Sequence, residues 1–568
     1  MNKKTIALIL LLAGICLLCA FCVSAAVPGG KSAGIADFCS GEGGQLAVRV
    51  YPGWQEETIR PYFCERDSAY YFFLPSALCG RAIRNQAPEL DLAVGGQPLG
   101  KGAVFEWEEG ETYQFSFGGE APVPVKFMLS SPLPALFITS QDGLMLLPEK
   151  GNEVTDRGTL LAVERDGSVS FGGGLTLKGR GNSSWYLFGK RPFNLKLDKS
   201  ARLLGMEKDR DWCLLANAWD YSYMNNKLAL DMAAGAGFSY VPDAEYADVY
   251  FDGDYLGVYL VTEKVEVDRN RIDIADLGLK NREVNLQRDP AAAEPFDTGS
   301  MRGVLLDSVP ADITGGYLIE RNYRLSPDYP ARLLPPSYFE TEESGTAFRV
   351  RVPEYADARE VEYIRSLTSR MEQAILSESG TSDSGESWLD FIELSSWVRS
   401  YLVAEIACDH DKDVTNAYYY KDSDRVDSRF HMGPVWDYDN RFGGQEDFTS
   451  PEIPSGLNPD GWLLRLMEKP EFYEAVVQEW NAFFRDYLRN EAPLKISRWQ
   501  EEIRQSVRMD NVRWFRGPGY PVKWPSAAGT FTDAYDFDAQ ADHLRAWLEA
   551  RCAFLDSRWG AGAGFPAE

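Results

Sequence analysis

The densest group of carboxylates in this chain lies between a predicted helix and a predicted strand. The segment reads Asp409-His-Asp-Lys-Asp-Val-Thr-Asn416, and the strand at 417–420 follows it directly. Two further aspartates, Asp437 and Asp439, stand where the second strand of the same predicted hairpin ends. Carboxylate and amide oxygens bind Mg²⁺ in proteins, and another aspartate can orient an attacking hydroxyl. The two segments together therefore favour phosphoryl transfer with a divalent cation.

The spacing within the first segment is more specific than its composition. Asp411 and Asn416 are five positions apart, as in the D-x-x-x-x-N pattern of protein-kinase catalytic loops. An EF-hand is disfavoured, because Val414 stands where that loop needs glycine and Tyr420 where it needs glutamate. A structural Ca²⁺ site or a solvated acidic loop is the open alternative.

A second candidate region is a glycine-rich turn followed by a strand. In Lys178-Gly-Arg-Gly-Asn-Ser-Ser-Trp185 the glycines allow backbone amides to approach an anion, while Arg180 and Ser183 add donors. The strand at 193–197 alternates, so that Lys196 projects from the face opposite Phe193. A tight turn and a solvated lysine would give the same pattern, so neither segment is decisive alone.

The elements that would position these residues change in kind along the chain. Residues 27–130 predict short strands separated by glycine and proline, which is typical of a small β-sandwich-like module. Residues 131–520 begin with strands, including a hairpin around 248–261, and continue as helices. Residues 521–568 predict a C-terminal helical extension. Strands followed by helices predict an α+β fold with a two-lobed main domain.

The N-terminus and the composition indicate an exported protein. Two lysines, a long apolar stretch and the small residues 24–26 predict a signal peptide over 1–26, although an uncleaved anchor would read similarly. The net charge is −27, which argues against binding to nucleic acid or to anionic membranes. Six cysteines follow the predicted cleavage site, and at most one disulfide is expected, among Cys39, Cys64 and Cys79.

Taken in order, several segments resemble the CotH-type kinases, a family named after a spore-coat protein H. The matching segments are Arg180-Gly-Asn-Ser-Ser-Trp185, the strand at 190–197, the hairpin at 252–263, the strand at 316–320, residues 411–416 and Pro434-Val-Trp-Asp-Tyr-Asp439. This resemblance covers about residues 132–516 and depends on the ordered set.

The resemblance implies an atypical protein-kinase-like fold that binds ATP with Mg²⁺ or Mn²⁺ and phosphorylates Ser or Thr of exported proteins. Carried over by position, it makes Asp411 the candidate base and Asn416, Asp437 and Asp439 metal ligands. The candidate nucleotide-binding residues are Lys196, Arg180, Ser183 and Glu263, the last either near the nucleotide or capping the junction between the lobes.

One departure is that Asn225-Asn226 replaces the Arg-Asn pair usual in the family. We expect a secreted or cell-surface protein that acts on an exported protein substrate and does not insert into the membrane after signal cleavage. A catalytically silent surface-binding or assembly protein is the alternative.

Overall fold

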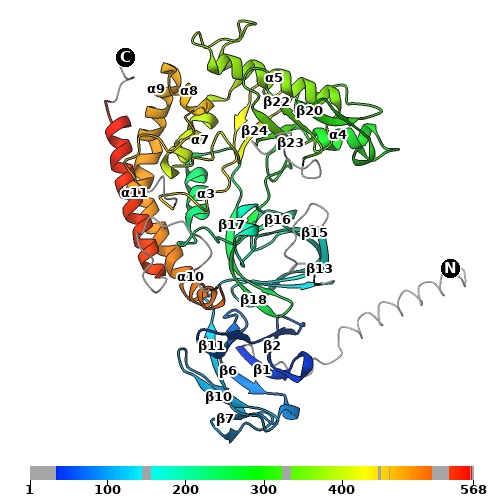
Figure 1. Ribbon diagram of the computed structural model, residues 1–568, viewed down its shortest axis with the longest axis vertical. Coiled ribbons are helices and arrows are strands. Elements are labelled where there is room, and N and C mark those ends of the chain that lie inside the picture. The colour runs from blue at the N-terminus through cyan, green and yellow to red at the C-terminus, as the bar shows by residue number, and fades with distance from the viewer. Residues whose placement is uncertain are drawn as a thin grey trace, which may run out of the picture.

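The computed structural model describes residues 34–141, 143, 155–322, 334–444, 450–459, 461–514, 536–562 and 565. The predicted signal peptide, residues 1–26, lies outside them. The chain is a mixed α+β protein with several sheets, as predicted (Figure 1). No helix in the described ranges is both long and apolar enough to cross a bilayer.

The first part of the chain, residues 34–129, forms two sheets around one aromatic-rich core. One sheet has the order β3 (Glu57–Ile59), β2 (Leu46–Val50), β1 (Gly34–Ser40), β6 (Cys79–Asn85) and β9 (Val104–Glu106). The other has the order β4 (Tyr62–Cys64), β5 (Ala69–Leu74), β11 (Val123–Leu129), β10 (Tyr113–Ser116), β7 (Ala93–Val94) and β8 (Gln97–Pro98). Phe38 of β1 packs against Phe127 of β11, with the two ring centroids 6.2 Å apart.

The expected disulfide is not formed. Cys39, Cys64 and Cys79 are all free and buried. Cys64 lies in the other sheet from Cys39 and Cys79. Within the first sheet the register places Gly34, at the opposite end of β1 from Cys39, beside Cys79. These thiols therefore fill the core as small apolar groups.

A closed barrel of seven strands follows. Its strands, in order around the barrel, are β12 (Ala135–Ser140), β13 (Thr155–Val163), β14 (Val169–Gly179), β15 (Phe193–Ala201), β16 (Asp209–Leu215), β18 (Asp254–Glu263) and β17 (Ala244–Phe251). Alternate residues such as Leu177, Leu195 and Leu214 fill the barrel interior. Their neighbours along each strand therefore face outward, which places Lys178, Asn194 and Cys213 side by side on the outer face.

A seven-stranded antiparallel sheet follows the barrel strands in the chain and is the second sheet of the main domain. Its order is β19 (Glu294–Asp297), β20 (Met301–Leu305), β22 (Tyr338–Glu340), β23 (Ala347–Val352), β21 (Tyr317–Arg321), β24 (Ala417–Lys421) and β25 (His431–Met432). The predicted strand running to Asp437 is shorter than expected: pairing stops at Met432, because Pro434 has no N–H for the ladder. Residues 434–444 are therefore a loop.

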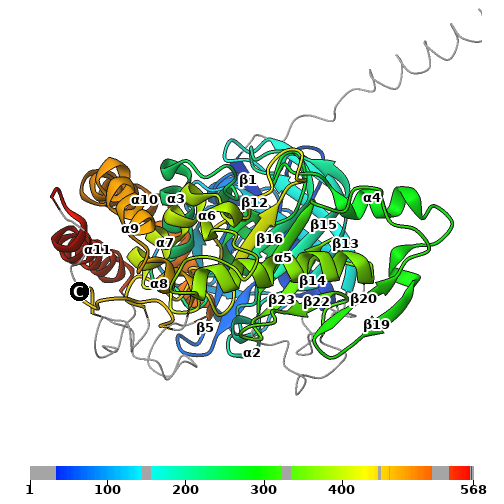
Figure 2. The same ribbon diagram turned by 90° about the horizontal axis from the view of Figure 1, so that it is seen from above.

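The helices of the described residues are α2 (Ser183–Tyr186), α3 (Asn225–Ala236), α4 (Leu277–Val284), α5 (Ala358–Leu376), α6 (Trp388–Phe391), α7 (Leu394–Ala407), α8 (Trp462–Leu466), α9 (Pro470–Glu479), α10 (Ala492–Trp514) and α11 (Phe537–Trp559). Helices α3, α7, α9, α10 and α11 lie together on one side of the second sheet and the barrel, whereas α4 lies on the opposite side (Figures 1 and 2). Helix α5 begins with a capping box of Asp357 and Glu360 and buries Val361, Ile364 and Met371 at helical spacing.

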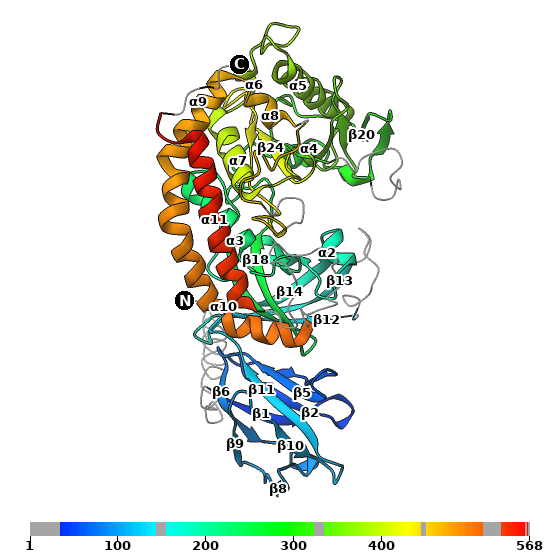
Figure 3. The same cartoon turned by 60° about the vertical axis from the view of Figure 1, so that its left-hand side comes forward.

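Helix α10 ties the first module to the rest of the chain (Figure 3). It contacts β4 and β11 of the module and β18 of the barrel. The hydroxyl of Ser506 accepts a hydrogen bond from the N–H of Ser131 at 3.0 Å and donates one to Asp248 of β17 at 2.8 Å. The segment that joins the two modules is thus held by a helix that comes nearly 400 residues later.

Candidate functional site

Helix α7 leads directly into the first acidic loop, residues 409–416. It is capped by Glu393, whose carboxylate accepts hydrogen bonds from the N–H groups of Ser395 and Ser396. It ends at Cys408, which has a φ of +54°, the left-handed conformation that glycine usually supplies at helix ends. The N–H of Asp409 then bonds back to the carbonyl of Ala404 at 2.9 Å. This turn directs residues 409–416 away from the helix and toward β24.

Helix α3 holds the second acidic loop, residues 434–444, through side-chain hydrogen bonds to its backbone. The side-chain oxygen of Asn226 accepts a hydrogen bond from the N–H of Tyr438 at 2.8 Å. The amide of Asn225 donates to the carbonyls of Asp439 at 3.2 Å and Arg441 at 3.1 Å. The Asn-Asn pair that departs from the family pattern therefore fixes the backbone that carries Asp437 and Asp439.

The two loops meet at Asn416 and Asp437. The Asn416 amide donates a hydrogen bond to Asp437 Oδ2 at 2.8 Å, although the residues are 21 positions apart. Asn416 has a φ of +58° and Asp437 a φ of +69°, in the left-handed region. Non-glycine residues held in such conformations are found preferentially at functional sites. Two of the predicted metal ligands are thus adjacent.

Asp411 is fixed in position by an arginine from the second loop. The Arg441 guanidinium contacts Asp409 at 2.5 Å and Asp411 at 2.8 Å. Asp409 and Arg441 are buried, whereas the Asp411 side chain is 40% exposed. Asp411 therefore has a defined orientation while one side of its carboxyl group is open to solvent.

The electrostatics around Asp437 and Asp439 favour a bound cation. Burial raises the pKa of Asp437, and the charges of Arg180 and Arg441 only partly oppose this. Burial, together with the neighbouring charge of Asp437, raises the pKa of Asp439 to about 8. Both carboxylates are therefore costly to ionise in the metal-free protein, and a divalent cation would relieve that cost. Asn416, Asp437 and Asp439 supply oxygen atoms that fit Mg²⁺ or Mn²⁺.

Arg180 is the one predicted nucleotide-binding residue that this site includes. Its charge acts on both Asp437 and Asp439, and its guanidinium lies 5.2 Å from the centre of the Trp436 ring. Ser183 lies at the start of α2 and is exposed. The glycine-rich turn thus contributes its arginine to the site.

Among the described residues, Lys196 and Glu263 form no hydrogen bond or ion pair with either acidic loop. Lys196 is 57% exposed on the barrel and forms an ion pair with Asp211 at 3.5 Å. Glu263 is buried and accepts hydrogen bonds from Arg271 at 2.7 Å and from the Tyr240 hydroxyl at 3.1 Å. Of the two roles open to Glu263, this network fits the structural one at the junction.

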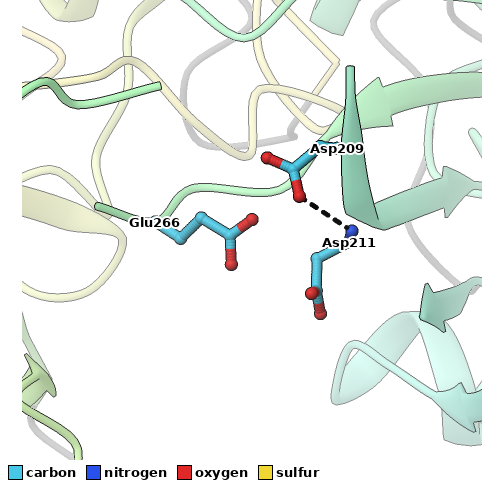
Figure 4. A group of neighbouring side chains, drawn as sticks. All are labelled: Asp209, Asp211 and Glu266. Carbon is cyan, nitrogen blue, oxygen red and sulfur yellow. Dashed lines mark hydrogen bonds between the residues drawn. The ribbon is translucent and has the colours of Figure 1, made fainter. Parts of the chain in front are cut away.

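A second acidic group was not anticipated. Oxygen atoms of Asp209, Asp211 and Glu266 all lie within 4.8 Å of one another (Figure 4). Burial raises the pKa of Glu266 to about 8. Lys264 contacts Asp211 at 3.3 Å and Glu266 at 3.8 Å, so that a lysine already compensates this group. The alternation of Asp209 and Asp211 on one strand was its only sequence signal.

Comparison with protein families decides the relationship of the chain. The family model described as CotH kinase protein matches residues 177–555, which is more than half of the sequence. The chain belongs to the CotH kinase family. The match begins within β14 and ends within α11, so it includes the glycine-rich turn and both acidic loops of this CotH kinase family member. No curated protein matches the chain.

Proposed function

We propose that this CotH family member is an ATP-dependent protein kinase that transfers the γ-phosphate to Ser or Thr of exported or surface proteins. The observation that carries the proposal is the contact between Asn416 and Asp437, beside an Asp411 that Arg441 holds in place. Family membership and the acidic, cation-favouring environment support it.

In this proposal each residue has a separate task. Asn416, Asp437 and Asp439 hold Mg²⁺ or Mn²⁺, which when bound neutralises the charge on the phosphate oxygens. Asp411 accepts a hydrogen bond from the acceptor hydroxyl and takes its proton as the oxygen attacks phosphorus. Arg441 holds the Asp411 carboxylate in one orientation, while Arg180 supplies positive charge beside the ligands.

The exported setting is part of the proposal. It is supported by the signal-like residues 1–26 and by the net charge of −27, which suits a solvated extracellular protein. N-terminal sequencing of secreted material would give a mature chain that begins at position 26 or 27. A chain that begins at Met1 in the membrane fraction would establish an anchor instead.

The proposed activity is tested by transfer of labelled γ-phosphate. The mature chain is incubated with ATP, Mg²⁺ or Mn²⁺ and a Ser-rich protein, and ATP binding is measured separately by calorimetry. We expect label in the acceptor or in the chain itself, and none with Asp437→Asn. A wild-type chain that is folded but binds no ATP would refute the kinase proposal.

The position of Lys196 favours a second candidate, a catalytically silent surface-binding protein. The predicted phosphate lysine is exposed and pairs with Asp211. In that case the wild-type chain would bind ATP without transferring phosphate under any metal condition.

A further inference from the structure

The outer face of the barrel and the second sheet bring basic residues together near the candidate site. Lys178 projects outward from β14, next to Asn194 of β15. Arg349 and Arg351 project from one face of β23 in the second sheet, because residues two apart on a strand share a face. The charges of Arg349 and Arg351 both act on Lys178, so residues from the two sheets are neighbours.

Arg351 connects this group to the metal-binding end of the site. It is anchored by Glu320 at 2.8 Å and donates a hydrogen bond to the Tyr418 hydroxyl at 3.1 Å. The charge of Arg180 also acts on Tyr418, and it acts on Asp437 as well. These interactions place a basic row of Arg180, Arg351, Lys178 and Arg349 near Asp437, with Glu320 and Glu354 among its cations.

Three members of this row form no ion pair with a described residue, and the negative charges of Glu354 and Glu320 offset their mutual repulsion only in part. In the part of the chain that the structure describes, Lys178, Arg180 and Arg349 form no ion pair within 4 Å, although the chain has 85 acidic and 58 basic residues. Arg349 Nε is shielded from solvent and has no hydrogen-bond partner among the described residues. All three side chains are partly exposed, so a ligand can reach them.

The acid–base properties of these cations agree with anion binding. Burial lowers the pKa of Lys178, and the charge of Arg349 lowers it further. Burial and the charge of Arg351 lower the pKa of Arg349 to about 10. Cations gathered in this way repel one another, and a polyanion among them would remove that repulsion.

We propose that Lys178 and Arg349, with Arg180, bind the phosphate tail of a nucleoside triphosphate and thereby take the role expected of Lys196. This inference rests on the proposed kinase function and assigns its phosphate-binding residues. The terminal phosphate lies at the Arg180 end, beside Asn416 and Asp437, and the remaining phosphates lie toward Lys178 and Arg349. Because Arg349 belongs to the second sheet, the nucleotide would bridge the barrel and that sheet.

The test compares charge-removing variants with matched surface controls. Lys178→Gln is compared with Lys199→Gln, from an exposed position on β15, and Arg349→Gln with Arg425→Gln, whose side chain is 84% exposed. The Kd for ATP should rise about 10- to 100-fold in each test variant, the range for losing a charge-assisted hydrogen bond, and change less than about twofold in the controls. Adenosine binding should be unchanged in all four.

A wild-type measurement keeps the proposal testable if a variant fails to fold. Inorganic tripolyphosphate should compete with ATP for the wild-type chain, whereas adenosine should leave tripolyphosphate binding intact. Two results would overturn the phosphate assignment while leaving the kinase proposal in place. The test variants could bind ATP as tightly as the controls, or their affinity for adenosine could fall by the same factor as their affinity for ATP. A wild-type chain that binds neither ATP nor tripolyphosphate would refute both.

Discussion

The role of Asp411 can be separated from that of the metal ligands by Asp411→Asn. The change removes the carboxylate that contacts Arg441 at 2.8 Å, but Arg441 keeps Asp409 at 2.5 Å and the carbonyl of Asn440 at 2.7 Å. Because Asp411 is 40% exposed, solvent screens its ion pair, and the loss of folding stability should be about 1 kcal/mol or less. ATP and metal affinity should stay within about threefold of wild type.

The chemical step should respond far more strongly. A positioned acid–base group contributes about 10²–10⁴-fold to rate, which corresponds to about 2.7–5.4 kcal/mol in the barrier. This change in the activation barrier is larger than the expected change in folding stability, so a single-turnover assay on folded protein can measure it separately. Asp437→Asn, in contrast, should weaken metal–ATP binding and transfer together, because the amide lacks the charge that the cation requires.

The controls decide between the two roles. Asp424→Asn, in the β24–β25 turn, removes a 48%-exposed aspartate outside the site and should leave both measurements unchanged. Loss of metal–ATP binding in Asp411→Asn, with Asp437→Asn unaffected, would reverse the assignments. Phosphate transfer at the wild-type rate by both variants would show that these loops do not catalyse the reaction.

Three further predictions follow from buried and exposed charges. Burial raises the pKa of Asp248 from 3.8 to about 7, so between pH 4 and 7 the folded state retains a proton that the unfolded state releases. Asp248 should therefore make the unfolding free energy fall as pH rises, by up to about 1.4 kcal/mol per pH unit, and urea titrations of Asp248→Asn should show a slope smaller by that contribution than the wild type. Lys196→Ala should change the Kd for ATP by less than about twofold in calorimetry, because Lys196 pairs with Asp211 at the surface; a tenfold loss would restore its predicted role. Glu405→Ala should lower the unfolding free energy by about 3–5 kcal/mol in urea, because it leaves the fully buried Arg551 without its carboxylate partner; a cost below 1 kcal/mol would contradict this view of the pair.

Local pattern was enough to single out residues that the fold brings together, and their roles stay predictions. The spacing of Asp411 and Asn416 and the position of Asp437 predicted residues that the fold places on two adjacent loops. The outward direction of Lys196 was also correct, because strand alternation is a local property. The ion pair of Lys196 depends on Asp211 of the neighbouring strand. Alternation within one strand carries no information about that partner.

The remaining features depend on contacts between distant segments. Arg441 joins Asp409 to Asp411 across about 30 residues, and nothing in its own surroundings in the sequence distinguishes it from a surface arginine. Arg349 becomes part of a basic row only because the second sheet lies against the barrel. The roles of Asn225 and Asn226 became visible only with the loop that they hold.

The late position of α10 has a consequence for how the chain acquires its structure. Asp510 accepts hydrogen bonds from Tyr223 at 2.9 Å and from the N–H of Val258 at 3.0 Å, and it pairs with the buried Lys190. Until residue 510 has been synthesised, the buried Lys190 ammonium group lacks the Asp510 carboxylate. Contacts of such long sequence separation form slowly, since a large loop must close first. A growing chain would therefore carry an incompletely stabilised barrel while residues 264–510 are synthesised, a period in which binding by a chaperone would have the greatest effect.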